Sequence, residues 1–435
     1  MKSYSGRCFL ISAKGDGIVD DTIPIQKAFD SGFKDLYAPE GKYKITDTIT
    51  SRTDCQNFIG AGRGAGGSSG SSLFKKGATQ FIWAGSGVKH MFKIDPEDGS
   101  IAWGGRIGNF SLHGDLISGV SGILAGSKTA NKIYENIEIV GMEDCFILGE
   151  AAYACRFYNV GCYEYTGKAL IGLGGNHNTL FNGFQINYCV PNGSYTGATG
   201  GFDLSTGTGI SFLGCDIEAG YAQNFVYLRG TDGVNFSGCY FESRSSLTQQ
   251  FIRMGDGTDP ILGINFNGNT FQGKGFTREA FYFVKVSGLN VQGNHFFGFA
   301  DWIINNAIIG TNNNFDNNWV SSTPKIFKSI AQGGNNGRGF YKESRIRLGT
   351  SITGVTTETT ILEITHYHHR PTSSREIEAN VIFTTEDATA TNTQITCRLQ
   401  KYIVETGWQY YGNSVVGKVY ANAGTRAILL GTLTI

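Results

Sequence analysis

The middle of the chain repeats one short pattern of apolar and polar positions. In each copy the first and third positions are apolar, the fifth is a glycine, and the sixth and eighth side chains are expected to face the interior. The four strongest copies begin 24, 30 and 25 residues apart, at Ile210, Val234, Ile264 and Leu289. A regular hairpin meander would not keep this period, whereas a coil of three short strands and three turns would. The pattern therefore predicts stacked coils.

Stacked coils bring equivalent positions of successive copies together, and this predicts the core. The first position gives an aliphatic row of Ile210, Val234, Ile264 and Leu289. The eighth position gives an aromatic row of Phe241, Phe271 and Phe296. The glycine between them marks a corner at which the alternation of side chains changes face.

Weaker copies extend the repeat toward both ends of the chain. They begin at Cys155 and Thr179 and near Gly105, Lys132 and Ile308. In the early copies the fifth position is asparagine, at Asn109, Asn136 and Asn159. Asparagine tolerates the turn, and stacked amides are expected to form a ladder.

The N-terminal segment predicts a helix followed by two strands. Gly15 and Gly17 form a turn, and Asp20 or Asp21 is expected to cap the helix. The apolar stripe of this helix is Ile25, Ala28 and Phe29, and Gly32 ends it. Two short strands then flank the turn Pro39-Glu40-Gly41.

The C-terminal segment differs from the repeat, which fades around residues 322–345. Its alternation predicts strands at Thr360–Ile364, Ala379–Phe383, Ile395–Leu399 and Val415–Val419. This spacing suits a small β-sandwich. We therefore expect three parts: an N-terminal cap with the first rungs at 1–75, a parallel β-helix at 76–325, and a C-terminal β domain at 326–435.

The string GDGxxDDTxxIQKAF at Gly15–Phe29, followed by PEGKY at Pro39–Tyr43, resembles the start of a known β-helix family. It is similar to the N-terminal start of the pectate-lyase-like β-helix of phage tailspikes and polysaccharide depolymerases. The resemblance implies an all-β fold, a right-handed parallel β-helix. It also implies a homotrimer, because β-helices of this family usually associate along their length, and a C-terminal domain that serves in trimerisation or carbohydrate binding. The motif caps the helix and carries no chemistry of its own.

Composition and charge narrow the functional classes. The chain of 435 residues has 62 Gly, 30 Phe and 20 Tyr but only 7 Pro, which suits short strands and tight turns. Its formal net charge is +0, without a run of basic residues, so we expect no nucleic-acid partner. No apolar stretch reaches the roughly 20 residues that span a bilayer, and we expect no membrane insertion. Nine scattered cysteines indicate buried thiols rather than a disulfide framework.

Side chains at the seventh and ninth positions are expected to face solvent together, and these rows contain the candidate chemistry. Asp216, Glu218 and Glu242 lie on this face, with Glu218 and Glu242 on neighbouring rungs about 4.8 Å apart. Repulsion among three carboxylates is expected to raise at least one pKa. A general acid beside an ionised carboxylate is the arrangement that glycoside hydrolysis needs. Glu218 and Glu242 are thus the predicted acid/base pair, and Asp216 tunes them or orients water.

Polar side chains around the acids are predicted to bind sugar hydroxyl groups. They are Asn187, Tyr240, Arg244, Thr270, Gln272 and His295. The combined interpretation is a phage tailspike depolymerase that binds and hydrolyses a bacterial capsular or O-antigen polysaccharide as an endo-glycosidase. No cofactor or metal is expected for this reaction.

Two alternatives remain open on the same scaffold. In a polysaccharide lyase, the acidic trio would hold Ca²⁺ and Arg244 would abstract a proton next to a uronate carboxylate. In a receptor-binding adhesin, the face would bind sugar without cleaving it. A bacterial or fungal pectinase fits less well, since the N-terminus shows no signal peptide.

The expected location is the virion tail, in contact with other phage tail proteins, after synthesis in the reducing host cytoplasm. No particle-binding module is obvious before residue 15. Either this sequence is a piece of a longer protein, or the chain attaches to the particle through another protein.

Overall fold

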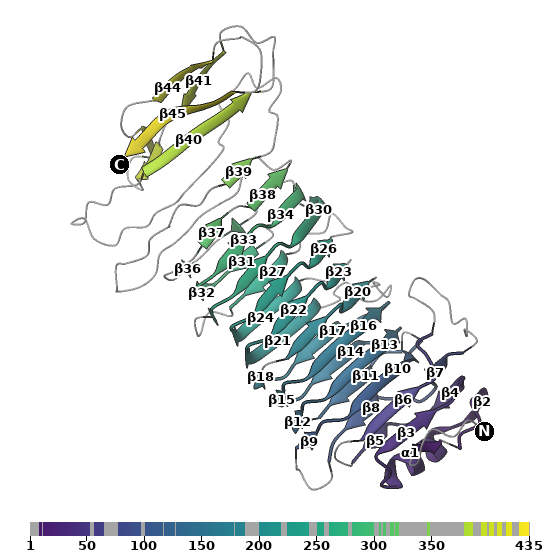
Figure 1. Cartoon of the computed structure of the whole chain (residues 1–435). Coiled ribbons are helices and arrows are strands. Elements are labelled where there is room, and N and C mark those ends of the chain that lie inside the picture. The colour runs from purple at the N-terminus through teal and green to yellow at the C-terminus, as the bar shows by residue number, and fades with distance from the viewer. Residues whose placement is uncertain are drawn as a thin grey trace. The chain divides into compact units, whose positions relative to one another are not determined.

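The structure, a computed structural model, shows the predicted right-handed parallel β-helix (Figure 1). It describes residues 8–10, 12–52, 56–64, 77–96, 101–115, 117–126, 128–177, 179–187, 200–218, 224–242, 250–255, 261–276 and 281–299, together with the strands beyond residue 300 that are named below. The chain divides into two compact units, Met1–His366 and Tyr367–Ile435.

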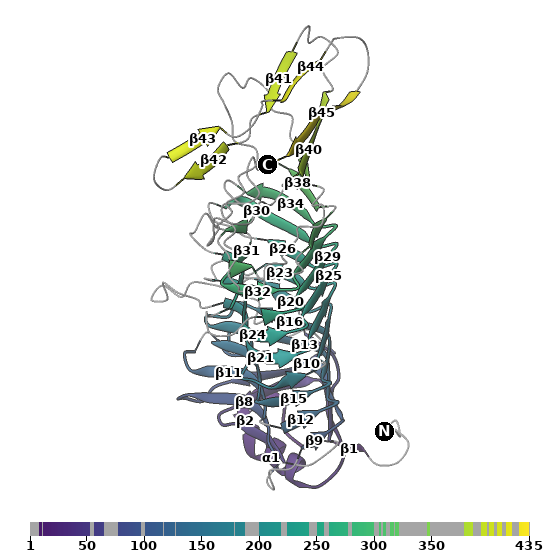
Figure 2. The same cartoon turned by 90° about the vertical axis from the view of Figure 1, so that its left-hand side faces the viewer.

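In the first unit, successive coils contribute one strand each to three parallel ladders, as Figure 2 shows. The first ladder contains β1 (Cys8–Leu10), β3 (Asp35–Ala38), β6 (Asn57–Gly60), β10 (Arg106–His113), β13 (Ile133–Val140), β16 (Arg156–Tyr163), β19 (Leu180–Asn182), β22 (Ser211–Leu213), β25 (Asn235–Ser237), β29 (Asn265–Asn267), β33 (Asn290–Gln292) and β37 (Asn314–Asp316).

The second ladder follows the corner after the first and shares the long strands β10, β13 and β16 with it. Its other strands are β2 (Asp16–Asp20), β4 (Gly41–Ile45), β7 (Thr79–Trp83), β20 (Gln185–Asn187), β23 (Asp216–Glu218), β26 (Tyr240–Glu242), β30 (Thr270–Phe276), β34 (His295–Phe299), β38 (Asn318–Ser321) and β39 (Ile346–Leu348).

The third ladder closes each coil. It contains β5 (Ile49–Ser51), β8 (Lys89–Ile94), β11 (Val120–Ala125), β14 (Asp144–Leu148), β17 (Lys168–Gly172), β21 (Gly200–Thr208), β24 (Asn224–Asp232), β27 (Gln250–Met254), β31 (Phe281–Phe283) and β35 (Ile304–Asn305). Shorter strands lie between the third and first ladders: β9 (Ala102–Trp103), β12 (Lys128–Ala130), β15 (Ala151–Tyr153), β18 (Asn176–His177), β28 (Ile261–Leu262), β32 (Lys285–Ser287) and β36 (Ile308–Ile309).

The corner between the first and second ladders has the predicted backbone geometry. Gly214, Gly238, Gly268 and Gly293 all adopt positive φ, between 56° and 61°. Asn109, Asn136 and Asn159 adopt the same left-handed conformation at φ 51° to 58°. Their amides also form the predicted ladder. Asn136 Nδ2 donates to Asn109 Oδ1 at 3.0 Å, and Asn159 Nδ2 donates to Asn136 Oδ1 at 2.8 Å.

The predicted core rows are buried and stack in register. Ile210, Val234, Ile264 and Leu289 are all 0% exposed. The ring of Phe271 stacks between Phe241 and Phe296, with centroid distances of 4.5 and 4.7 Å. The third position adds a parallel row in which Phe236 lies 4.6 Å from Phe212 and 4.9 Å from Phe266.

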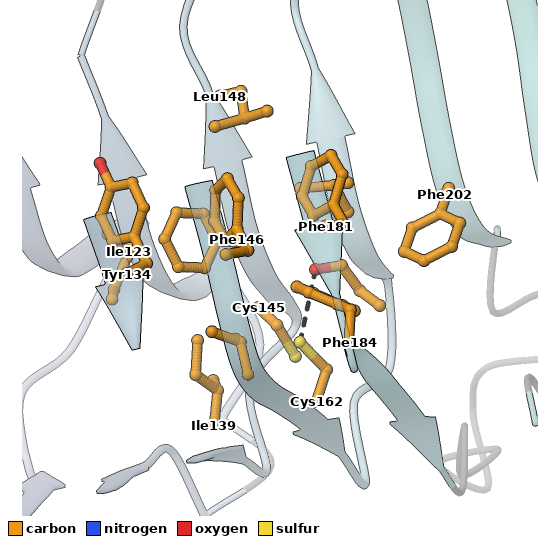
Figure 3. Close-up of a cluster of buried hydrophobic side chains, with 14 of the residues drawn as sticks. Ile123, Tyr134, Ile139, Cys145, Phe146, Leu148, Cys162, Phe181, Phe184 and Phe202 are labelled. Carbon is orange, nitrogen blue, oxygen red and sulfur yellow. Dashed lines mark hydrogen bonds between the residues drawn. The ribbon is translucent and has the colours of Figure 1, made fainter. Parts of the chain in front are cut away.

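Cysteines fill gaps in this core, as predicted. The free thiols in the described part of the chain are Cys145, Cys155, Cys162, Cys215 and Cys239, and all five are buried. Figure 3 shows Cys145 and Cys162 among Ile139, Phe146 and Phe184. The Cys162 thiol donates to the carbonyl of Ala169 at 3.7 Å.

The N-terminal cap is the helix α1 (Thr22–Asp30), which buries Thr22, Ile25, Ala28 and Phe29. Of the two predicted capping residues, Asp20 bonds to the helix: its Oδ1 accepts from the backbone N–H of Thr22 at 3.0 Å. Asp21 instead accepts from the backbone N–H of Lys14 at 2.7 Å and so anchors the preceding turn. No helix among the described residues is long and apolar enough to cross a membrane.

The second unit consists of antiparallel strand pairs. β40 (Glu378–Thr385) pairs with β45 (Arg426–Thr434), β41 (Thr393–Cys397) with β44 (Val415–Val419), and β42 (Gln400–Ile403) with β43 (Gly407–Tyr410). Three of the four predicted strands coincide with β40, β41 and β44, while Thr360–Ile364 lies outside the described residues. The proposed sandwich and the boundary at residue 326 stay predictions.

The corner geometry predicts the effect of adding a single methyl group. A Cβ added at Gly238 meets no atom within 4 Å, so only backbone strain at φ 61° opposes it. Gly238→Ala should lower the free energy of unfolding by about 1 kcal/mol. Gly238→Asn should cost less, because asparagine occupies this corner in three earlier coils. Urea unfolding curves of the three proteins test this; equal losses for Ala and Asn would contradict it.

Candidate functional site

The outer face of the second ladder carries an almost continuous polar row. The strand registers align, from the N-terminal coil onward, Lys42, Gln80, Ser111, Glu138, Gly161, Gln185, Asp216, Tyr240, Thr270, His295 and Trp319. We call this the seventh-position row. A ninth-position row runs beside it on the same face, two residues further along each strand.

The structure brings the predicted acids onto this face. Strand β23 carries Asp216 and Glu218, and β26 carries Glu242. Asp216 is paired with Tyr240 and Ile217 with Phe241, so Glu218 and Glu242 are the next residues in two adjacent strands. Glu218 is partly exposed, whereas Glu242 is only 7% exposed. The expectation that both side chains face open solvent is therefore wrong for Glu242.

The side chain of Tyr240 explains part of this burial. Its hydroxyl lies 2.5 Å from Glu242 Oε2 and also contacts the amide of Gln272 in β30. Burial raises the pKa of Tyr240, and the hydrogen bond to Glu242 and the charges of Glu242, Glu218 and Asp216 raise it further. Tyr240 therefore keeps its proton at neutral pH.

One hydroxyl proton cannot serve two acceptors, so two proton arrangements fit this cluster. In the first, Tyr240 donates to an ionised Glu242 and Gln272 turns its NH₂ group toward the hydroxyl oxygen. In the second, a protonated Glu242 donates to Tyr240, which donates to the carbonyl oxygen of Gln272. The orientation of Gln272 thus reports the protonation state of Glu242.

The remaining predicted residues are distributed along the same face. Thr270 and Gln272 in β30 and His295 in β34 are partly exposed neighbours of Tyr240 and Glu242. Asn187 pairs with Glu218 through its backbone, and its side chain lies outside the described residues. Arg244 lies outside them altogether.

Within the described ranges, no group of three or more His, Cys, Asp or Glu side chains is arranged to hold a metal ion. The calcium site of the lyase alternative stays a prediction.

The C-terminal end of this outer face carries aromatic side chains, which were not predicted from the sequence. Trp319 follows His295 in the seventh-position row and is 48% exposed. His295 lies against Phe297, with ring centroids 4.9 Å apart. The sequence held a signal for Trp319, because Asn317-Asn318-Trp319 aligns with Gly293-Asn294-His295 one copy earlier. A copy that begins near Ile308, as expected, does not align Trp319 with His295.

A second polar cluster, also not predicted, lies on the N-terminal part of the face. Arg63, in the glycine-rich segment after β6, donates to Asn159 Oδ1 at 2.7 Å and to the Tyr163 hydroxyl at 3.3 Å. Its Nε lies 3.7 Å from Glu138 Oε2, and the Glu138 side chain is 1% exposed. Tyr163 donates in turn to Gln185 Oε1 at 2.7 Å, and burial raises the pKa of Tyr163 to about 12. This segment therefore covers a buried carboxylate.

Comparisons with known proteins identify the fold. No protein-family model matches the sequence, and no curated protein matches it either. The Dettilon tailspike protein superposes with a TM-score of 0.61 at 13% identity, over 96% of this chain and 77% of that one. PfbA, a surface adhesin of Streptococcus pneumoniae, superposes with a TM-score of 0.55 at 11% identity, over 83% and 91%.

A viral protein gives a weaker match. The chain spans 59% of ORF18 of Geobacillus virus E2, over 78% of its own length, at 16% identity and a TM-score of 0.47. The likenesses to the Dettilon tailspike protein and to PfbA are of fold: the chain is a tailspike-like parallel β-helix.

The Arg63 cluster predicts a stability difference between two arginines. Arg63→Ala removes the cation that lies 3.7 Å from the buried Glu138 carboxylate and should lower the free energy of unfolding by about 2–3 kcal/mol. Adding Glu138→Gln should restore much of this loss. The matched control is Arg106→Ala, since Arg106 is 57% exposed and pairs with Glu135 at 3.2 Å. Its loss should stay below about 1 kcal/mol. Equal losses for Arg63 and Arg106, by urea unfolding, would contradict the assignment.

Proposed function

We propose that the chain is a phage tailspike depolymerase that binds and hydrolyses a bacterial capsular or O-antigen polysaccharide as an endo-glycosidase. The observation that carries the proposal is the placement of Asp216, Glu218 and Glu242 on adjacent strands of one outer face of a parallel β-helix, with the Tyr240 hydroxyl 2.5 Å from Glu242 Oε2. Carboxyl groups on neighbouring strands supply the acid and the base that glycoside hydrolysis requires.

Glu242 is the better candidate for the general acid. It is 7% exposed, and a carboxyl group removed from water is costly to ionise. As the general acid it would take the second proton arrangement described above, with Tyr240 as its acceptor and Gln272 as the acceptor beyond. Glu218, more exposed on the adjacent strand, is then the base or nucleophile, and Asp216 orients water or tunes the pair.

Side chains along the same face supply binding groups for the sugar. Thr270, Gln272 and His295 offer hydroxyl, amide and imidazole partners for sugar hydroxyl groups. Trp319, half exposed at the C-terminal end of the row, offers an apolar ring on which a sugar face can stack. Asn187 and Arg244 stay in the proposed binding set.

The assembly and location belong to the same proposal. The protein would act as a homotrimer on the virion tail, in contact with other phage tail proteins and with the polysaccharide. The fold shared with the Dettilon tailspike protein supports this setting. The buried, reduced cysteines fit synthesis in the host cytoplasm before release.

A receptor-binding adhesin is the second candidate. PfbA, described as a surface adhesin, shares the fold at a TM-score of 0.55. The same face would then bind the polysaccharide without cleaving it, and the carboxylates would accept hydrogen bonds from sugar hydroxyl groups.

The Glu242→Gln variant separates the two. We expect the wild-type protein to release oligosaccharides that carry one added water per cut from at least one polysaccharide in a panel of purified capsules and O-antigens. Glu242→Gln removes the acid and should slow release by about 10³-fold while binding persists. The readout is mass spectrometry of the products together with a sedimentation binding assay.

Glu150→Gln is the matched control, because Glu150 is exposed in the turn between β14 and β15. It should cleave at the wild-type rate. Unchanged cleavage by Glu242→Gln would remove Glu242 from the mechanism. A bound polysaccharide that the wild-type protein leaves intact would favour the adhesin, and products lighter by one water would favour a lyase.

A further inference from the structure

The outer face of the third ladder carries a cationic and aromatic row that the proposed reaction does not use. The strand registers align Asp203 in β21, Tyr227 in β24, Arg253 in β27 and Tyr282 in β31. Tyr227, Arg253 and Tyr282 are all partly exposed. Since adjacent strands are about 4.8 Å apart, these side chains form one contiguous surface.

Two of the cations beside this row are already neutralised. Arg229 donates to Asp203 through Nε at 2.9 Å and Nη2 at 2.8 Å, a bidentate pair. Lys168 also hydrogen-bonds to Asp203, and its backbone N–H donates to Asp144 at 2.8 Å. Arg229 and Lys168 are therefore engaged in structural contacts on this face.

Arg253 differs from both. Its guanidinium carbon lies 4.8 Å from the ring centroid of Tyr227 and 5.9 Å from that of Tyr282. Its Nε is buried and has no hydrogen-bond partner, and in the described part of the chain Arg253 forms no ion pair. The hydroxyls of Tyr227 and Tyr282 make no hydrogen bond there either. Within the described residues, the Arg253 guanidinium thus lies against two phenol rings without an anionic partner.

We propose that Arg253, Tyr227 and Tyr282 form a subsite for a sugar carboxylate, so that the polysaccharide carries an acidic residue of the uronate class. A guanidinium held between aromatic rings presents a planar fork that matches a carboxylate, and the phenol hydroxyls supply the flanking hydrogen bonds. That the carboxylate belongs to a saccharide rests on the proposed function.

The position of this subsite also bears on which sugar is cut. Strands β26 and β27 follow each other in one coil, so Glu242 and Arg253 belong to adjacent faces of the same coil. The carboxylates around Tyr240 repel an anionic sugar, whereas Arg253 attracts one. The acidic residue of the polymer would therefore be bound at Arg253, and the sugar at Glu242 would be uncharged.

The test uses sodium glucuronate, glucose and inorganic phosphate as probes, with saturation-transfer NMR on the full chain. Glucuronate should bind the wild-type protein, and Arg253→Gln should weaken it by at least about tenfold. Arg253→Lys should be intermediate, because it keeps the charge without the planar fork. Arg156→Gln, which removes an exposed arginine of the first ladder, should bind like the wild type. Circular dichroism checks that each variant is folded.

Three results would overturn the subsite: no binding of glucuronate to the wild-type protein, equal binding to Arg253→Gln, or equally strong, Arg253-dependent binding of phosphate. Glucose binding should not depend on Arg253. On any polysaccharide that the wild-type protein cleaves, Arg253→Gln should raise KM and leave kcat unchanged. If the wild-type protein cleaves none, the proposed hydrolase fails, while the glucuronate titration still decides the subsite.

Discussion

The whole structure depends on the in-register stacking of equivalent residues, one strand spacing apart, along parallel ladders. This stacking favours residues that pair well with copies of themselves. Phenylalanine rings do so, as the centroid distances of 4.6 and 4.9 Å on either side of Phe236 show. Asparagine does so as well: Asn294 Oδ1 accepts from Asn269 Nδ2 at 2.9 Å, and Asn294 Nδ2 donates to Asn318 Oδ1 at 3.0 Å. These buried amides satisfy one another from coil to coil, which a buried polar group must do.

The same stacking also explains why the repeat could be recognised in the sequence. A position that stacks on itself is constrained to one chemical class of side chain, so the core rows from Ile210 onward and the corner glycines repeat visibly. The N-terminal helix and its buried stripe were predictable for a different reason, because caps and amphipathic spacing are local signals. The general fold and the face carrying the acids therefore followed from local patterns alone.

Contacts between segments far apart in the sequence could not be predicted from local sequence patterns. Arg63 and Glu138 are two coils apart, and no local pattern in the glycine-rich segment shows that it covers a carboxylate. Alternation places Glu242 on the outer face, but it does not encode that the Tyr240 hydroxyl, two residues earlier on the same strand, contacts both Glu242 and Gln272 of the next strand. The roles of Glu218, Glu242 and Asp216 in catalysis stay predictions, since position on a face does not determine chemistry.

The contrast between core and face within successive copies bears on where function lies. The third position, buried, is Phe212, Phe236, Phe266 and Val291. The seventh position, on the outer face, is Asp216, Tyr240, Thr270 and His295. These four stacked residues are of four different chemical types, so contacts between identical side chains do not stabilise this row. In a solenoid each coil contacts only its neighbours, so the core can hold the fold while the face varies from coil to coil. The repeat is lost at solvent-facing positions and persists in the core. A surface shaped by a heterogeneous ligand such as a polysaccharide would show this contrast.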